Sequence, residues 1–336
     1  MLIQGGGTMV NGLYMEKPGR VTWCEVPMTQ RLQADEVKIN VIYGGICGSD
    51  IGVYKGKLPH ANYPVVPGHE ILGEVVEAGQ DAKVEIGDRV VVQPNSYCGK
   101  CECCRAGKTN ICPEKKSLGI NKHGGFAEYF VISSNYIVKV PEKLSNERAI
   151  LIEPLAVIVH ALKKVTIAKG SSVAIIGCGT EGMLAVALAS YFGAKITAID
   201  INPEKLAKVQ AHYPAIEICH PENVHENRFD IVLEVAGVKE SFEQCMEIVK
   251  PGGAVVAIGF PAVAEIPVVK MVRKELSIFG SIIYNVPDDF LSSIDYLLDE
   301  NFYVEPIISD IVTVKDFEKA YEKAASGKYR KIVLAF

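Results

Sequence analysis

Residues 173–182 read Val-Ala-Ile-Ile-Gly-Cys-Gly-Thr-Glu-Gly, an apolar run followed at once by three glycines in the spacing G-x-G-x-x-G. After a strand and at the start of a helix, this spacing is typical of a dinucleotide-binding unit. Gly177 permits the tight turn, Gly179 lets the backbone approach a pyrophosphate, and Gly182 lets helix and strand pack closely. The helix N-terminus attracts the phosphate charge. The stretch therefore predicts a strand–turn–helix unit that binds a dinucleotide.

An acidic residue follows this fingerprint at a suitable distance. Asp200 comes directly after the apolar run 195–199. A carboxylate there accepts hydrogen bonds from ribose hydroxyls and repels a 2′-phosphate, which favours NAD over NADP. Ordinary turn glycines are the alternative interpretation, but strand, helix and carboxylate together argue against it. Further residues assigned to the cofactor site are Thr180, Glu181, Lys205, Gly259 and Ser281.

Residues 150–286 alternate between apolar β-type runs and amphipathic segments. The runs cover residues 172–176, 195–199, 229–235, 254–259 and 277–282. Segments such as 182–192 and 204–212 have helical patterning, and Asn202-Pro203 suits the cap and first turn of the second. This alternation predicts an α/β domain with a doubly wound parallel sheet covered by helices on both faces.

The rest of the chain is patterned differently. Between residues 20 and 140, short β-rich runs at 36–43, 71–78, 88–93 and 126–132 are separated by Gly, Pro and Asp turns. They predict a mostly β domain, such as a partly closed barrel. Helical patterns around 290–299 and 314–326 and a closing strand at 331–336 could belong to either domain.

Length and charge limit the classes of function. With 336 residues, 49% of them hydrophobic, the chain can form two domains with substantial cores. A net charge of −5 without long charged runs argues against nucleic acid or a membrane surface as partner. The apolar stretch 173–192 is interrupted by glycines and Glu181, so we interpret it as strand and helix. No secretory signal is visible, and we expect a cytoplasmic location.

Five of the ten cysteines lie close together in the sequence. Cys98, Cys101, Cys104 and Cys112 have the spacing C-x2-C-x2-C-x7-C, and Cys103 is left without a role. Four thiolates from a tight loop satisfy tetrahedral zinc and leave no open position, which indicates a structural site. An iron–sulfur cluster is the chemical competitor, and unligated surface thiols are the third interpretation.

Thiol, imidazole and carboxylate groups occur in three further segments: Gly45-Ile-Cys47-Gly-Ser49-Asp50, Pro67-Gly-His69-Glu70 and Ile152-Glu153-Pro154-Leu155. Each segment alone is a weak signal. In this order, and followed by the glycine fingerprint, they resemble the zinc-containing medium-chain alcohol and polyol dehydrogenases. The resemblance covers nearly the whole chain.

The resemblance implies both a fold and a site. It implies a GroES-like catalytic domain at residues 1–149 and 287–336 with both zinc sites, and a Rossmann NAD-binding domain at 150–286. It implies that Cys47 and His69 hold a catalytic zinc, with Glu70 or Glu153 completing the protein ligands. Zinc is a Lewis acid that lowers the pKa of a bound hydroxyl, which prepares the neighbouring carbon to give hydride to nicotinamide.

Two more residues take roles from the resemblance. Ser49 matches the hydroxyl that begins a proton relay, although a Ser that caps the helix after Cys47 is the alternative. Asp50 matches a position that supports the orientation of a ligand.

The chain departs from polyol-oxidising relatives at two positions. Gly52 stands where they commonly have His, and Ile283 stands where they have an arginine that grips substrate hydroxyls. A less polar secondary alcohol or a diol becomes comparatively more plausible. Lys55 and Lys57 follow Cys47 in the sequence and could bind a phosphate, so a phosphorylated polyol stays an alternative substrate.

We therefore expect reversible oxidation of a secondary alcohol, diol or polyol to a ketone, with NAD and two zinc ions per chain. A sugar-phosphate dehydrogenase with the same chemistry is the alternative. A protein that binds NAD and zinc without turnover would need a missing ligand. The resemblance also implies a homodimer or homotetramer whose partner is a small-molecule alcohol or ketone.

Overall fold

The computed structural model describes residues 8–28 and 31–336, which form two compact units. Unit 1 comprises the described residues up to Glu153 together with Asn285–Phe290 and Ile308–Phe336. Unit 2 comprises Pro154–Tyr284 and Leu291–Ile307. No helix in the described residues has both the length and the apolar character that crossing a bilayer requires.

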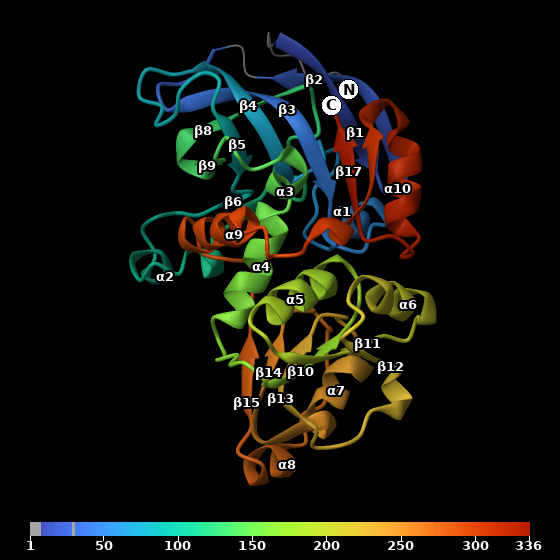
Figure 1. The fold of residues 1–336 in the computed structure, drawn as a ribbon. Helices are drawn as coiled ribbons and strands as arrows, with labels where there is room; N and C mark the ends of the chain where they lie inside the picture. The colour runs from blue at the N-terminus through green and yellow to red at the C-terminus, as the bar shows by residue number, and fades with distance from the viewer. Residues whose placement is uncertain (1–7, 29–30) are drawn as a thin grey trace. The chain divides into compact units, whose positions relative to one another are not determined.

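Unit 2 contains a parallel β-sheet. Its strands lie in the order β12 (Glu217–Cys219), β11 (Lys195–Ile199), β10 (Ser172–Ile176), β13 (Phe229–Glu234), β14 (Val249–Ala257) and β15 (Ser277–Gly280) (Figure 1). Every neighbouring pair is parallel. From β10 the chain first adds β11 and β12 on one side, then β13, β14 and β15 on the other. The switch point between β10 and β13 is where such sheets bind ligands.

Helices connect most of the strands of this sheet, and one helix precedes the first of them. They are α4 (Ile152–Leu162), which begins in unit 1, α5 (Thr180–Tyr191), α6 (Pro203–His212), α7 (Lys239–Ile248) and α8 (Val268–Arg273). α5 follows β10 directly, and Asn202 caps α6 by accepting hydrogen bonds from the Glu204 and Lys205 amides. The observed alternation agrees with the doubly wound sheet that the sequence predicts.

One segment differs from the expected division of the chain. Residues 291–307, which the resemblance places with the catalytic domain, belong to unit 2. The segment carries most of α9 (Asp288–Leu298), and its Tyr296 ring lies 5.7 Å from Tyr191 and 5.8 Å from Phe192. The Tyr191 hydroxyl donates to Asp299 at 2.6 Å. These aromatic contacts with the end of α5 join the segment to unit 2.

Unit 1 is mostly β-structure. Its main sheet has the order β16 (Ile308–Thr313), β17 (Lys331–Ala335), β3 (Glu36–Ile46), β4 (Glu70–Ala78), β5 (Arg89–Val92) and β9 (Ile137–Lys139), and β8 (Tyr129–Ser133) also pairs with β3. Other strands are β1 (Thr8–Lys17), β2 (Arg20–Met28), β6 (Asn95–Ser96) and β7 (Lys116–Ser117). The helices are α1 (Gly48–Tyr54), α2 (Glu102–Arg105), α3 (Asn146–Ala149) and α10 (Phe317–Ala325).

The register of this sheet positions the residues of the candidate site. β17 and β4 flank β3 on opposite sides, and both run antiparallel to it. Gly45 pairs with Glu70, and Ile46 pairs with Ile332. The start of β4 and the start of β17, which are far apart in the sequence, therefore both lie beside the end of β3, where α1 begins.

Candidate metal and dinucleotide sites

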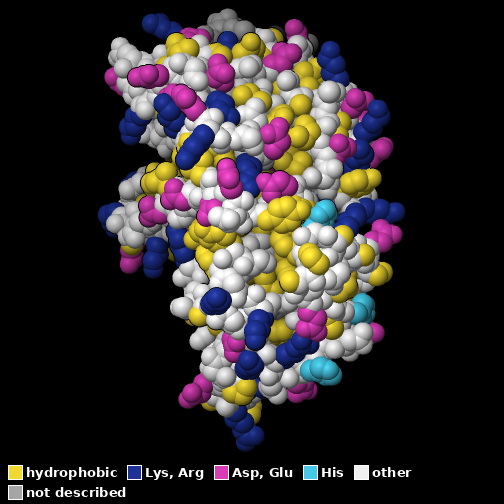
Figure 2. Space-filling model, viewed as in Figure 1, with side chains coloured by type: hydrophobic (Ala, Val, Ile, Leu, Met, Phe, Trp, Pro, Cys, Tyr) yellow, Lys and Arg dark blue, Asp and Glu magenta, His cyan; other side chains and the backbone are white. Residues whose placement is uncertain are grey.

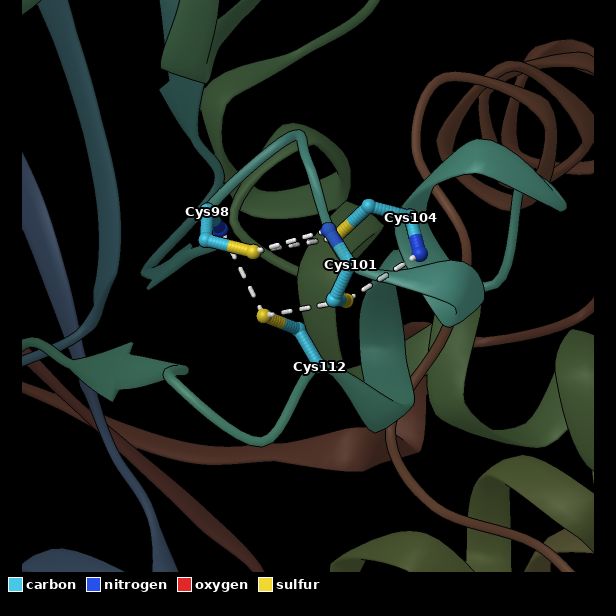
Figure 3. A group of neighbouring side chains, drawn as sticks. All are labelled: Cys98, Cys101, Cys104 and Cys112. Atoms are coloured by element: carbon cyan, nitrogen blue, oxygen red, sulfur yellow. Dashed lines mark hydrogen bonds between the residues drawn. The ribbon is translucent and has the colours of Figure 1, made fainter.

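Four cysteines gather in the loop between β6 and β7. The sulfur atoms of Cys98, Cys101, Cys104 and Cys112 lie within 4.8 Å of one another and face a common centre (Figure 3). The Cys98–Cys104 and Cys101–Cys112 sulfur pairs are 4.0 Å apart. A zinc tetrahedron with bonds of about 2.3 Å has sulfur–sulfur edges of about 3.8 Å. The donor set therefore fits a closed tetrahedral zinc site.

Backbone amides favour thiolate at this centre. The Cys98, Cys101 and Cys104 amides each donate to a cluster sulfur at 3.4 Å. The Lys100 and Cys101 amides lower the pKa of the Cys98 thiol to about 7, whereas burial, followed by the hydrogen bond with Cys101, raises the pKa of Cys104 to about 12. The thiols cannot all ionise so close together without a cation. Cys103 is not part of this group.

A second group of metal-ligand atoms lies where β3 meets α1. The ligand atoms of Cys47, His69 and Glu70 are within 4.8 Å of one another. Cys47 is the N-cap residue of α1, and His69 and Glu70 stand at the start of β4. A thiolate, an imidazole and a carboxylate from three protein residues leave a fourth position open, which suits catalytic zinc.

Asp50 contacts two of these residues, Cys47 and His69. It is fully buried, accepts a hydrogen bond from the Cys47 amide at 2.9 Å, and has one oxygen 3.5 Å from His69 Nδ1. Burial lowers the pKa of His69, but the charge and hydrogen bond of Asp50 and the hydrogen bond and charge of Cys47 together outweigh it and raise that pKa well above its usual value. Asp50 thus approaches one ring nitrogen of His69, Nδ1. Ser49 Oγ lies 3.4 Å from the other ring nitrogen, Nε2.

Glu70 has a second partner, which the sequence analysis did not find. Both of its carboxylate oxygens bind Lys331 Nζ, at 2.5 and 2.6 Å, and both side chains are buried. A Cβ on Gly45 would lie 2.0 Å from Glu70 Oε2, so the glycine leaves room for the carboxylate. The only sequence signal for Lys331 is a charged residue at the head of an apolar terminal strand.

Glu153 is the other carboxylate that the resemblance offers for zinc. It is the second residue of α4 and is 8% exposed, but it is not in the group of ligand atoms with Cys47 and His69. The structure thus brings Glu70 to the metal-ligand cluster, and a role for Glu153 remains a prediction.

The glycine fingerprint forms the expected turn after β10. Gly177 has φ +103°, and a Cβ on Gly182 would lie 1.7 Å from the Gly177 carbonyl oxygen. Gly179 is the N-cap residue of α5, and a Cβ there would meet open space. That open space at a helix N-terminus fits a pyrophosphate. Thr180 and Glu181 begin the helix.

Asp200 closes this turn from the end of β11. Its carboxylate accepts from the Cys178 and Asn202 amides, both at 2.8 Å, and Lys205 Nζ lies 3.9 Å away. Burial and the charge of Asp200 raise the pKa of Cys178 to about 12, so this thiol is packed rather than reactive. Gly259 and Ser281 follow β14 and β15 at the same edge of the sheet.

Comparison with known families assigns most of the chain to two family descriptions. Residues 33–142 match the family described as alcohol dehydrogenase GroES-like domain, and residues 182–299 match the family described as zinc-binding dehydrogenase. These ranges contain the cysteine loop, Cys47, His69 and Glu70 in the first, and most of the parallel sheet in the second.

Individual proteins are similar over almost the whole length. Sorbitol dehydrogenase of Bacillus subtilis is 32% identical over 313 residues, 88% of each chain. A zinc-binding dehydrogenase of Sinorhizobium meliloti, solved with NADP, has a TM-score of 0.89 at 27% identity and covers 98% of this chain and all of that one. Galactitol-1-phosphate dehydrogenase of Escherichia coli has a TM-score of 0.88 at 27% identity, covering 97% of this chain and all of that one.

The GroES-like and Rossmann fold predicted from the sequence is confirmed, and so are zinc and a nicotinamide dinucleotide as cofactors. The relatives are dehydrogenases that act on CH–OH groups, and this chain is an oxidoreductase of the same zinc-dependent kind. It belongs to the zinc-containing medium-chain dehydrogenase/reductase family.

Proposed function

We propose that this protein reversibly oxidises a secondary alcohol, diol or polyol to a ketone, with NAD as hydride acceptor. The group formed by Cys47, His69 and Glu70 carries the proposal, because its donor set leaves a position for a substrate hydroxyl. A zinc ion held there would supply Lewis-acid chemistry.

The protein groups around this position have separable tasks. Asp50 orients His69 through its buried carboxylate. Ser49 Oγ, the hydroxyl beside His69 Nε2, accepts the proton of the substrate hydroxyl and passes it toward solvent. Because Gly52 offers no side chain, the proton leaves Ser49 by a path that does not use a histidine at position 52.

Asp200 supports NAD as the cofactor. Its carboxylate stands at the end of β11, where an adenosine ribose lies in such folds, and a 2′-phosphate there would meet a negative charge. The Sinorhizobium meliloti relative was solved with NADP, so the two dinucleotides need direct comparison.

A spectrophotometric screen tests the proposal. NADH and NADPH absorbance would be followed with secondary alcohols, diols, polyols and polyol phosphates. We expect turnover with NAD and a non-phosphorylated alcohol, and its loss together with about one zinc ion per chain in His69→Ala. Normal turnover in that variant would refute the catalytic site.

A polyol phosphate is the second candidate substrate. The similarity to galactitol-1-phosphate dehydrogenase favours it, and the exposed Lys57 follows α1 in the same unit as the metal ligands. Lys55 is less available, because its Nζ donates to the Ala325 carbonyl at 3.1 Å. A higher kcat/KM for the phosphate ester, lost in Lys57→Ala, would select this candidate.

We also propose that the chain is a cytoplasmic homo-oligomer, a dimer or tetramer, that associates through unit 2. β15 is an edge strand in the described sheet. Exposed apolar side chains gather in and before α8: Phe260, Val263, Ile266, Val268, Val269 and Val272. A second copy pairing with this edge would cover them. Light scattering on Val269→Glu should show smaller particles than wild type, whereas Val76→Glu in unit 1 should not.

The proposal includes no nucleic-acid or membrane partner. On the face shown in Figure 2, basic and acidic side chains are interspersed rather than gathered by sign. A mixed surface with a net charge of −5 suits a protein that handles small molecules.

A further inference from the structure

Glu234 is a buried carboxylate at the centre of the nucleotide-binding sheet. It is the last residue of β13 and is 0% exposed. Its Oε1 accepts three hydrogen bonds, from the Ala236 amide at 3.0 Å, the Gly237 amide at 2.9 Å and Ser241 Oγ at 2.6 Å. The carboxylate therefore closes the turn that leads from β13 to α7.

The other oxygen of Glu234 faces the next turn of the sheet. Oε2 has no hydrogen-bond partner among the described residues, and a Cβ on Gly259 would lie 2.5 Å from it. The same Cβ would lie 2.4 Å from the Gly237 amide nitrogen. The Glu234 carbonyl also accepts from the Ile258 and Gly259 amides, at 2.9 and 3.1 Å. One residue thus fixes the turns after both β13 and β14.

The turn after β13 also contacts the glycine fingerprint. The Val235 amide donates to the Ile176 carbonyl at 2.9 Å. A Cβ on Gly177 would lie 2.9 Å from the Ala236 amide nitrogen, so the two turns touch across the switch point. A buried carboxylate oxygen without a hydrogen-bond partner lowers the free energy of unfolding. Proteins commonly keep such a group where it supports a functional site.

We propose that Glu234 is a positioning residue for the nicotinamide half of the dinucleotide. In a doubly wound sheet the first unit, here β10 to β12, binds the adenosine half, and the second unit, here β13 to β15, binds the nicotinamide half. Glu234 holds the turns of the second unit at the edge where ligands bind. Since it is fully buried beneath Gly259, it acts through these turns and does not touch the cofactor.

This inference rests on the proposed NAD-linked function and is tested by binding, without turnover. Calorimetry would measure the Kd of NADH and of AMP for wild type and for Glu234→Asp. The shorter side chain keeps the charge but withdraws the carboxylate from the Ala236 and Gly237 amides. We expect the Kd of NADH to rise about tenfold and the Kd of AMP to change less than about twofold.

Asp230 provides a matched control at the opposite end of the same strand. Its carboxylate also joins neighbouring strands, accepting from the Ser172 amide at 2.8 Å and pairing with Lys250 Nζ at 2.9 Å. Asp230→Asn should leave both dissociation constants unchanged. Equal losses of NADH affinity in the two variants, or equal losses of NADH and AMP affinity in Glu234→Asp, would overturn the proposal.

A milder variant decides the question if Glu234→Asp does not fold. Ser241→Ala removes one of three donors and should raise the Kd of NADH about threefold while sparing AMP. If Glu234→Asp folds, an unchanged Kd of NADH in that variant overturns the positioning role. If it does not fold, an unchanged Kd of NADH in Ser241→Ala overturns it. Wild type that binds AMP but not NADH overturns the proposed function itself.

Discussion

Lys331 Nζ is bound to both carboxylate oxygens of Glu70, a residue 261 positions earlier in the chain, and neither side chain is more than 1% exposed. This pair lies next to Cys47 and His69 and sets the charge that Glu70 presents to them. Its burial makes removal of one partner costly, because the other charge remains without compensation.

Lys331→Met should lower the free energy of unfolding by about 3–5 kcal/mol, since Glu70 loses its buried counter-charge. Urea unfolding followed by circular dichroism measures the loss. The double variant with Glu70→Gln should recover part of it. Lys139→Met removes a lysine that is 60% exposed in its pair with Asp88, so it should cost far less stability. Similar losses for the two lysines would contradict the role of burial.

Gly45→Ala should displace Glu70 and weaken metal binding beside Cys47. The new methyl group would lie 2.0 Å from Glu70 Oε2, whose position Lys331 fixes. Gly48→Ala, three residues later at the start of α1, is the control because its Cβ would meet nothing within 4 Å. Zinc content by mass spectrometry should fall by up to about one ion per chain in the first variant only. Full zinc content in Gly45→Ala would speak against the packing argument.

Cys104→Ser should remove the structural zinc and destabilise the loop between β6 and β7, because one of the four clustered sulfurs is lost. Cys103→Ser, at the adjacent position outside the cluster, should retain full zinc content and thermal stability. Metal analysis together with the melting temperature distinguishes the two. Zinc loss in Cys103→Ser would show that the cluster is assigned to the wrong cysteines.

Asp200→Ser should shift cofactor preference toward NADP. Removal of the carboxylate loses acceptors for the ribose hydroxyls and relieves repulsion of a 2′-phosphate. We expect the ratio of kcat/KM for NAD to that for NADP to fall at least about tenfold. Glu204→Gln, an exposed acid in the first turn of α6, should leave the ratio unchanged. An unaltered ratio in Asp200→Ser would place the discrimination elsewhere.

Asp230 predicts a pH dependence of stability. The hydrogen bond from Ser172 lowers the pKa of this carboxyl from 3.8 to about 2. A lowered pKa in the folded state gives stability that is present above the unfolded-state value and is lost as the pH falls toward 2. Asp230 is half-exposed, so the contribution is at most about 1 kcal/mol. Urea midpoints of wild type and Asp230→Asn should differ at pH 7 and converge as the pH falls below 4. A constant difference would be contrary to this assignment.

Local patterns predicted most of unit 2. The runs 172–176 and 195–199 coincide with β10 and β11, and the segment 204–212 differs from α6 by one residue. Apolar runs and caps are local properties, which is why the sequence reveals them. The assignment of Leu291–Ile307 to unit 2 depends on ring contacts between residues about a hundred positions apart, and no local pattern encodes them.

Local sequence patterns likewise predicted some residues of the candidate sites, whereas others are recognised only in the folded structure. Cysteine spacing and the glycine fingerprint are short-range signals, and the structure places their residues together. The pairing of Glu70 with Lys331 requires the register of β4, β3 and β17, which tertiary packing sets. Glu234 likewise resembles an ordinary strand residue until the turns around it are known.

The position of Lys331 in the last strand has a consequence for biosynthesis. Cys47, His69 and Glu70 leave the ribosome early, but the cation that neutralises Glu70 comes from the final strand, after the whole Rossmann sheet has been made. During translation, the early segment holds an unneutralised carboxylate beside its metal ligands. We therefore expect the catalytic centre to mature only after β17 has been synthesised, so nascent chains that end before β17 should lack it.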